Sequence, residues 1–487
     1  MLSKPHLVRL ALPVRSSCSC FTRLNFQQDE IAPLFKWCVV ERQSNKKPFL
    51  GLSIEFLTLY TPFLIAGRVI VTFIADFSIS IYIGLSINIG MVMENICLPS
   101  GFWAHGIRVE IKTQGKDLGL IISNPPSQFF GAFTQNSFAA APVQYCKEVL
   151  KSGQKISHLV VNSGNANACT GPQGLLAVQE TVKALRQGFP RAEGVLVAST
   201  GVIGHQLPLE KITQGLNSYP SLHTQTPNED AFCEAILTTD LVKKETAQTL
   251  QFASGTVHLG GVCKGSGMIH PNMATMLAFI TTDIDLPSHF QNQFLKIVEK
   301  SFNSISVDGD QSTNDTVFLL ANGASGVSYT HLSPTEQAQF VEALQNCFIS
   351  LAKQIAADGE GATKLVEIRV TGAASADEAQ KIARQVSNSP LVKTALFGND
   401  PNWGRIVASL GSLGLAIPQD HCRITLGDQI LFDKGSPLPK DMPVLKKTLS
   451  AKEVVIGIDL QRGSSDWSFW TCDFSYDYVK INAEYHT

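Results

Sequence analysis

The residues best suited to chemistry lie in one short segment, Lys264-Gly-Ser-Gly-Met-Ile-His-Pro-Asn-Met-Ala-Thr275, which an apolar run from Met276 to Thr282 follows directly. If the bond between Ala274 and Thr275 were cut, Thr275 would become an amino terminus. Its α-amino group, with an ordinary pKa of about 8, could then accept the proton of its own hydroxyl. One residue would supply both nucleophile and base. A threonine that opens a strand is also an ordinary β-former, so the segment by itself leaves both interpretations open.

A second candidate is the turn Ser199-Thr200-Gly201, which follows the apolar run Val195 to Ala198. A backbone N–H and a hydroxyl at such a turn could point at one position and stabilise the oxyanion of a tetrahedral intermediate. A turn that merely ends a strand has the same composition, so this motif also carries two interpretations.

The elements that must position these residues are indicated by the hydrophobic pattern. Short apolar runs at His158 to Val161, Val195 to Ala198 and Met276 to Thr282 end in polar clusters, which is typical of buried strands that feed functional loops. Helical spacing from Leu175 to Leu185, and a capping box at Ser333-Pro-Thr-Glu336, predict helices between the strands. The mixture indicates an α/β or α+β protein. No Walker loop or strand-linked GxGxxG motif appears, which disfavours nucleotide-binding folds.

Composition narrows the class of function. The chain has 487 residues, of which 44% are hydrophobic and 16% charged, so it can bury a core. A net charge of -2 gives no reason to expect nucleic-acid binding. The 11 cysteines are odd in number and scattered, which favours reduced thiols in a reducing compartment. The histidines lack metal-ligand spacing, so no metal is expected.

The first ninety residues differ from the rest, with a net charge of +4 against -6 for residues 91–487. Residues 1–26 are basic and contain no acid, as in an organellar transit peptide, and Val69 to Met93 is nominally long enough to span a bilayer. Three interpretations compete: a targeting segment, a membrane anchor, or translation begun upstream of a true start at Met91 or Met93. The last is favoured, because periodicity and caps begin only after Met93.

Several strings, in the same order along the chain, resemble the ornithine acetyltransferase family of arginine biosynthesis, also called bifunctional glutamate N-acetyltransferase and amino-acid acetyltransferase. The resemblance extends from about Gly101 to the last residue and leaves residues 1–90 outside it. Besides the Lys264 segment, the strings are Thr134–Pro142, Asn162–Gly171, Ala198–Gly204, Ser306–Asp315, Gly398–Arg405 and Asn482–Thr487.

The resemblance implies self-cleavage between Ala274 and Thr275, with Thr275 as the nucleophile and Thr200 and Gly201 as the oxyanion hole. It implies substrate contacts at Thr238 or Thr239, Lys264, Thr275, Glu360, Asn482 and Thr487. Lys264 suits the carboxylate of an amino acid and Glu360 suits the amine of ornithine. Asn482 and Thr487 lie at a chain end that is usually frayed, so a role for them requires the tail to fold back onto the site.

The fold implied is a layered α/β sandwich of β-sheets covered by helices, of the self-processed amino-terminal-nucleophile type. The domain organisation expected is a non-family extension at residues 1–92, an α chain at 93–274 and a β chain at 275–487. The enzyme would move acetyl from N-acetylornithine to glutamate in a ping-pong cycle, with acetyl-CoA as an alternative donor and no cofactor. Two α and two β chains would assemble in the cytoplasm without a membrane, or in an organellar matrix if residues 1–90 are a transit segment.

Two rival functions remain. One is an amidohydrolase or aminopeptidase on the same scaffold, in which water attacks the acyl-enzyme, and the other is an uncleaved, inactive binding protein. The sequence departs from the family pattern at His270, where a small residue is usual, and at Gln135 and Ser137, where a basic residue is common. His270 lies near the scissile bond, but the resemblance does not make it a general base.

Overall fold

The structure is a computed structural model that describes residues 24–26, 38–40, 95–270 and 276–484. The chain divides into two compact units, residues 1–92 and 93–487. In the first unit, the short strands β1 (Leu24–Phe26) and β2 (Cys38–Val40) pair antiparallel.

Two β layers of the second unit share one long strand, β4 (Leu118–Phe133). The first half of β4 pairs with β3 and β5, and its second half pairs with β11. One layer has the order β3-β4-β5-β6 and the other β4-β11-β9-β8-β7. The remaining strand bounds are β3 (Phe102–Ile107), β5 (Ile156–Asn165), β6 (Gly194–Val202), β7 (Lys244–Phe252), β8 (Gly255–Lys264), β9 (Leu277–Thr282) and β11 (Thr316–Ala321).

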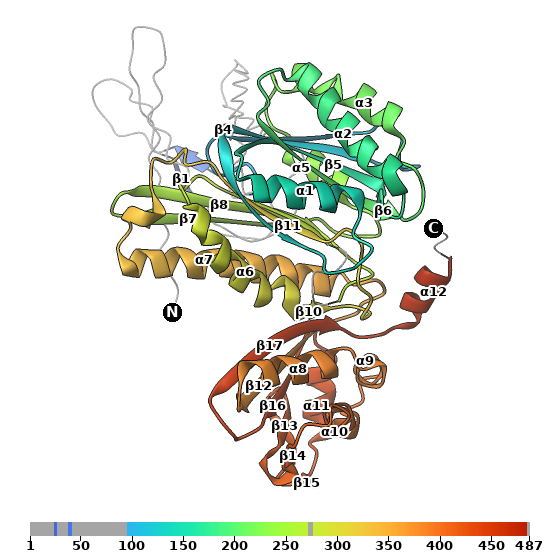
Figure 1. Cartoon of the computed structure of the whole chain (residues 1–487). Coiled ribbons are helices and arrows are strands. Elements are labelled where there is room, and N and C mark those ends of the chain that lie inside the picture. The colour runs from blue at the N-terminus through green and yellow to red at the C-terminus, as the bar shows by residue number, and fades with distance from the viewer. Residues whose placement is uncertain (1–23, 27–37, 41–94, 271–275, 485–487) are drawn as a thin grey trace, which may run out of the picture. The chain divides into compact units, whose positions relative to one another are not determined.

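Helices cover the outer faces of both layers (Figure 1). Helices α2 and α3 share a core with the β3–β6 layer, and α6 and α7 share one with the β7–β11 layer. Helices α1 and α5 contribute to a third core between the layers. The predicted α/β sandwich covered by helices is confirmed. The helix bounds are α1 (Ala141–Ser152), α2 (Gly171–Gly188), α3 (Leu209–Leu216), α4 (Tyr219–Leu222), α5 (Glu229–Ile236), α6 (Gln291–Glu299) and α7 (Pro334–Ala357).

Side-chain alternation explains why these strands are apolar throughout. On β9, Ala278 and Ile280 face the core beneath α6 and α7, whereas Leu277 and Phe279 face the core between the layers. Successive side chains of a strand point to opposite faces, so a strand buried on both faces reads as a continuous hydrophobic run. The apolar runs predicted to be strands are confirmed as parts of β5, β6 and β9.

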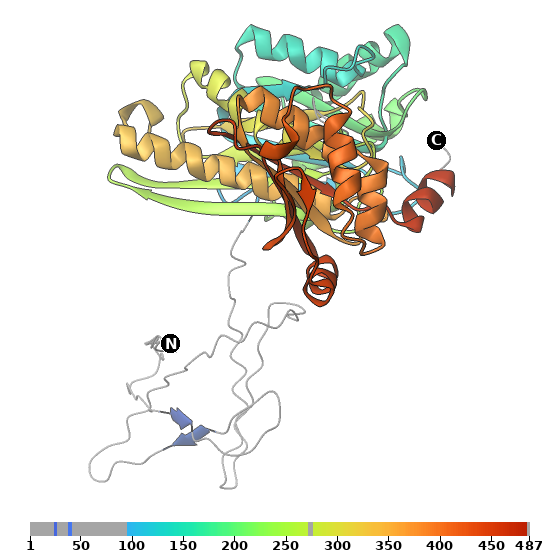
Figure 2. The same ribbon diagram turned by 90° about the horizontal axis from the view of Figure 1, so that it is seen from below.

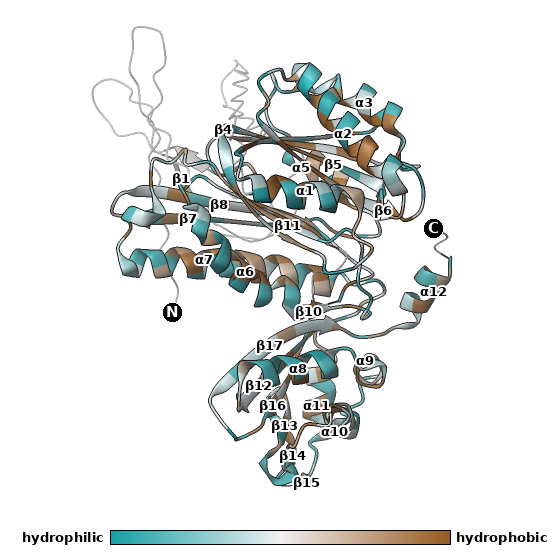
Figure 3. Ribbon diagram, viewed as in Figure 1, coloured by the Kyte–Doolittle hydropathy of each residue, from teal (hydrophilic) through white to brown (hydrophobic). Residues whose placement is uncertain are grey.

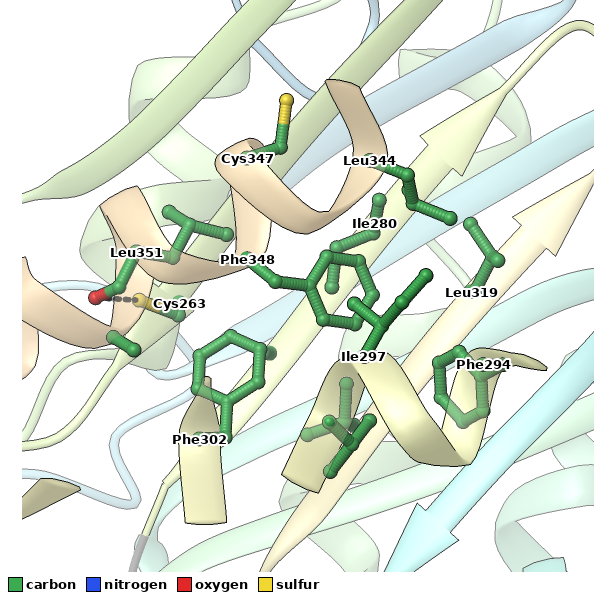
Figure 4. Close-up of a cluster of buried hydrophobic side chains, with 14 of the residues drawn as sticks. Cys263, Ile280, Phe294, Ile297, Phe302, Leu319, Leu344, Cys347, Phe348 and Leu351 are labelled. Atoms are coloured by element: carbon green, nitrogen blue, oxygen red, sulfur yellow. Dashed lines mark hydrogen bonds between the residues drawn. The ribbon is translucent and has the colours of Figure 1, made fainter. Parts of the chain in front are cut away.

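Capping and hydrophobic patterns in the sequence also account for the helices. Helix α7 begins with the predicted capping box, in which the Glu336 backbone N–H donates to Ser333 Oγ and the Ser333 N–H donates to the Glu336 carboxylate. Its apolar face, with Phe348 and Leu351, packs beside α6 and onto β9 and β11 (Figure 4). Hydrophilic residues interrupt the hydrophobic ones along α2 and α7 (Figure 3), as expected of helices with one solvated face. The hairpin of β7 and β8 runs alongside α7 (Figure 2).

A second, seven-stranded sheet has its own hydrophobic core, and all of its strands except β10 follow α7 in the sequence. Its order is β10-β17-β12-β16-β13-β14-β15, and helices α8 to α11 pack on it. The sequence patterns do not indicate this separate core within residues 275–487. The bounds are β10 (Ile305–Ser306), β12 (Leu365–Ala373), α8 (Ala376–Ser387), α9 (Pro390–Phe397), α10 (Trp403–Gly411), β13 (Arg423–Leu426), β14 (Gln429–Asp433), β15 (Ser436–Pro437), α11 (Met442–Leu449), β16 (Glu453–Asp459) and β17 (Ser465–Cys472).

The last helix is α12 (Tyr476–Glu484), which lies near the carboxyl terminus (Figure 1). None of its residues is buried. Among residues the structure describes, no helix is both long and apolar enough to cross a membrane. The eight cysteines within residues 95–270 and 276–484 are free thiols.

Candidate active site

A cavity of about 360 Å³ opens where β6, β8 and the loop after α7 meet. It gathers predicted site residues from five separate segments of the sequence. The predicted residues that line it are Thr200, Gly201, Thr238, Thr239, Lys264, Glu360 and Asn482. The predicted residues Ala274, Thr275 and Thr487 lie outside the described residues.

Thr200 and Gly201 lie near the end of β6, beside the parallel strand β5. Gly201 has a φ of 132°, and a Cβ there would lie 2.3 Å from the Gly164 carbonyl carbon of β5. Only glycine fits this close approach of two backbones. Gly201 therefore places half-buried strand backbone at the cavity wall, directly after the buried Thr200 side chain.

Lys264 ends β8, and its side chain is 3% exposed. Its Nζ donates a 2.7 Å hydrogen bond to Thr238 Oγ1 and lies 3.5 Å from Thr200 Oγ1. Burial lowers the pKa of this ammonium, because desolvation penalises the charged form, and the nearby Asp240 carboxylate opposes that effect. Lys264 therefore presents a buried cation that links the Thr200 turn to the Thr238 turn.

Glu360 follows α7 and also lines the cavity. Its backbone N–H donates to the Ser266 carbonyl at 3.0 Å, and its carboxylate lies against the backbone of Gly267, where a Cβ would come within 2.3 Å of Oε2. Asn482 of α12 donates from Nδ2 to Glu360 Oε2 at 2.9 Å. The tail thus folds back onto the cavity, as its predicted role requires.

Both flanks of residues 271–275 are held by one segment, Ser306–Thr316. On the amino-terminal side, the Asp308 carboxylate accepts hydrogen bonds from the Met268 and Ile269 N–H groups, at 2.6 and 2.9 Å. Met268 has a φ of 56°, which is costly for a residue with a side chain. Burial raises the pKa of Asp308 to about 6.

On the carboxyl-terminal side, Met276 is fixed in the same way. Its N–H donates to Asp315 Oδ1 at 3.2 Å, and its carbonyl accepts from the Thr316 N–H at 3.1 Å. Burial raises the pKa of Asp315 well above its ordinary value. Two aspartates of a single segment therefore fix the described residues on either side of the predicted cleavage bond.

The cavity is also lined by residues that are not among the predicted site residues. Asn314 Nδ2 donates to the carbonyls of Ala166 and Ser199, at 2.6 and 2.8 Å, and so ties the loop after β5 to the strand that carries Thr200. The signal was available, because the strings Asn162–Gly171 and Ser306–Asp315 are among those that carry the resemblance. The unassigned lining residues are Ala166, Ile203, Gly267, Met268, Ser312, Thr313 and Asn314.

His270 is not among the described residues that line the cavity. Its ring lies near Asn388 at the end of α8, and burial lowers its pKa. Within residues 95–270 and 276–484, no group of three or more His, Cys, Asp or Glu side chains could hold a metal ion.

Comparison with known proteins places the chain in context. A family model described as the ArgJ family matches residues 103–487. Over 399 residues the chain is 45% identical to the arginine biosynthesis bifunctional protein ArgJ of Bacillus licheniformis, covering 81% of this chain and 97% of the relative. The same-named protein of Geobacillus kaustophilus is 44% identical over 394 residues, covering 80% of this chain and 96% of the relative.

Two solved structures are also similar in sequence to this chain. The chain is 41% identical to the arginine biosynthesis bifunctional protein ArgJ of Bacillus halodurans, covering 42% of this chain and 97% of that one, with a TM-score of 0.40. It is 34% identical to the ornithine acetyltransferase of Mycobacterium tuberculosis, solved with ornithine, covering 37% of this chain and 95% of that one, with a TM-score of 0.33.

Proposed function

The chain belongs to the ArgJ family, and on that premise we propose that it is a self-cleaving acetyltransferase of arginine biosynthesis, which moves acetyl from N2-acetyl-L-ornithine to L-glutamate. The observation that carries this proposal is the single cavity that gathers Thr200, Gly201, Lys264 and Glu360. It offers a polar turn, a buried cation and a carboxylate around one space, which matches a substrate with an amide, a carboxylate and an amine.

Self-cleavage comes first in the proposed sequence. The Thr275 hydroxyl attacks the Ala274 carbonyl carbon, the peptide C–N bond breaks, and the acyl group moves from nitrogen to oxygen. Water then hydrolyses the ester and frees the α-amino group of Thr275. The positive φ of Met268 and the anchors at Asp308 and Asp315 support this step, because they constrain both sides of the bond that breaks.

Acetyl transfer then follows in two halves. The freed α-amino group accepts the hydroxyl proton while Thr275 Oγ attacks the acetyl carbonyl of acetylornithine, and donors at Thr200 and Gly201 stabilise the oxyanion. The C–N bond breaks, and ornithine leaves with the proton. The amine of glutamate attacks the acetyl-Thr275 ester in reverse, which regenerates the hydroxyl. Lys264 pairs with the substrate carboxylate and Glu360 with the amine of ornithine.

The remaining expectations belong to the same proposal. Acetyl-CoA acylates Thr275 as an alternative donor. Two α chains (93–274) and two β chains (275–487) assemble in the cytoplasm, and residues 1–92 take no part in catalysis. A genuine transit segment at residues 1–90 would instead direct the enzyme to an organellar matrix.

Incubation with N-acetylornithine, with and without glutamate, tests the proposal. A transferase releases about one equivalent of ornithine per active site without glutamate, and turns over only when glutamate is added. Continuous ornithine release without glutamate would instead identify an amidohydrolase. No release and a single uncut chain in a denaturing gel would identify a binding protein.

A further inference from the structure

A buried ionic network lies directly behind the cavity. Lys244 Nζ contacts Asp240 Oδ1 at 2.8 Å and Asp358 Oδ2 at 2.6 Å. The side chains of Lys244 and Asp240 are fully buried, and that of Asp358 is 6% exposed. None of these three residues is among the described residues that line the cavity, so the proposed mechanism does not use them.

Asp240 holds the Lys264 side of the cavity. Its carboxylate accepts the Thr238 N–H at 3.0 Å and the Gly265 N–H at 2.6 Å, and it lies 3.8 Å from Lys264 Nζ. One side chain therefore fixes the turn that carries Thr238, the backbone next to Lys264, and the position of the Lys264 ammonium.

Asp358 holds the Glu360 side. It precedes Glu360 by two residues, its carbonyl accepts a 2.7 Å hydrogen bond from Ser266 Oγ, and its carboxylate accepts the Leu241 N–H at 3.0 Å. Because Lys244 bonds to both aspartates, a single ammonium joins the segments that carry Thr238, Lys264 and Glu360.

The charges of this network act on Lys264. Asp240, Lys244, Glu360 and Asp315 all act electrostatically on its ammonium, and the ammonium of Lys112 is also near. Burial alone would raise the pKa of Asp240, but the ammonium groups of Lys264 and Lys244 hold it well below its usual range. Asp240 is thus a permanent anion shared by two buried cations.

We propose that Asp240 is a positioning residue that keeps Lys264 charged and directed at the substrate carboxylate, and that Lys244 orients Asp240 and Asp358 so that Lys264 and Glu360 face one substrate. This inference rests on the proposed function. A buried ion pair that serves only folding would share the geometry, so the test must read out the charge of Lys264 and not stability alone.

The test is the pH profile of kcat/KM for N-acetylornithine in Asp240→Asn, which keeps the shape and removes the charge. The acid limb of the profile reports the α-amino base of Thr275, and the alkaline limb reports loss of the Lys264 proton. An opposite charge within about 4–6 Å shifts a pKa by about 1–3 units. The alkaline limb should therefore move down by about one pH unit or more, and KM at pH 8 should rise about tenfold or more, with self-cleavage retained.

Matched variants separate this role from a structural one. Asp240→Glu retains the charge and should restore most of the alkaline limb. Asp283→Asn removes another buried aspartate, which directly follows β9 and bonds to His258 of β8. This variant should leave both limbs of the pH profile in place. If Asp240→Asn does not fold, Asp358→Asn is measured instead. Its alkaline limb should also move to lower pH, but by less than is expected for Asp240→Asn, because Asp240 must then neutralise Lys244 alone.

An unmoved alkaline limb in a folded, cleaved Asp240→Asn or Asp358→Asn enzyme would overturn the inference. That result leaves the proposed function standing, because the wild-type enzyme would still transfer acetyl. Failure of the wild-type enzyme to transfer acetyl to glutamate would instead overturn the proposed function.

Discussion

Asn482 donates a 2.9 Å hydrogen bond to the carboxylate of Glu360, although the two residues lie 122 positions apart. This bond joins helix α12, which buries none of its side chains, to the wall of the cavity. The chain end is therefore part of the site through a polar contact and not through hydrophobic packing.

Glu360→Gln should lower kcat/KM for N-acetylornithine about tenfold to a hundredfold. The substitution keeps the shape and removes the charge that faces the substrate amine, and a hydrogen bond to a charged group contributes about 1.5–3 kcal/mol, with about 1.4 kcal/mol per factor of ten. Steady-state kinetics measures this loss. Self-cleavage should survive, since the proposed cleavage does not use Glu360.

The matched control is Glu342→Gln on the exposed face of α7. It makes the same chemical change, and the variant should have the same kcat/KM for N-acetylornithine as the wild type. If the kinetics of Glu360→Gln equal those of the wild type, the carboxylate does not contact the substrate. Loss of both acetyl transfer and self-cleavage would show that Glu360 belongs to the catalytic or structural apparatus.

The purified protein should consist of two fragments divided between Ala274 and Thr275. The β fragment would hold 213 residues, from 275 to 487, and amino-terminal sequencing should read Thr-Met-Leu-Ala-Phe. Thr275→Ala should remain full-length and inactive because it lacks the hydroxyl, whereas Thr275→Ser retains one and should still be cleaved. Any other amino terminus refutes the assignment of the site.

Asp308→Asn should slow self-cleavage about tenfold or more. Asn has one acceptor oxygen where Asp308 uses two, so one of the N–H groups of Met268 and Ile269 loses its charged partner. In the wild type, the carboxylate ionises as the pH rises through about 6, and it accepts these bonds best when charged. Cleavage of freshly translated precursor, followed on gels between pH 5 and 8, should lose an inflection near pH 6 in the variant. The same inflection in Asp308→Asn would show that another group causes it.

His158→Phe should make the protein more resistant to acid. Burial, together with the nearby His223, lowers the folded-state pKa of His158 to about 4 from an ordinary value of 6.5, so the unfolded state binds its proton more readily. The stability that the neutral ring contributes is complete above pH 6.5 and is lost as the pH falls through 4, by about 3–4 kcal/mol in all at about 1.36 kcal/mol per pKa unit. Differential scanning calorimetry should show a smaller drop in Tm between pH 7.5 and 4.5 for the variant. Parallel drops in the two proteins would contradict the assignment.

Removal of residues 1–90 should leave folding and acetyl transfer intact, because the matched family region begins at residue 103. Expression of the shortened chain, with a solubility and activity assay, checks this. A dead or insoluble product would make the segment structural. A reporter fused to residues 1–90 that reached an organelle or membrane would overturn the cytoplasmic expectation.

The sequence by itself determined the elements that depend on local pattern. The apolar runs of β5, β6 and β9 and the capping box of α7 could be read directly, because strand alternation and helix capping involve residues only a few positions apart. The ordered strings of the resemblance also indicated which loops would carry the site, and seven of the predicted residues line one cavity.

Only the tertiary structure decided which charges are buried and what they face. In the sequence, Asp240 and Lys244 look like an ordinary surface pair four residues apart, yet both side chains are fully buried, and Lys244 finds its second partner, Asp358, 114 residues away. The separate core of the second sheet was not indicated by the sequence either, and although the resemblance implied that the tail folds back onto the site, the direct bond between Asn482 and Glu360 came only from the structure. The physical reason is that a buried charge is tolerated only beside a compensating partner, and the fold, not the local sequence, brings that partner within reach.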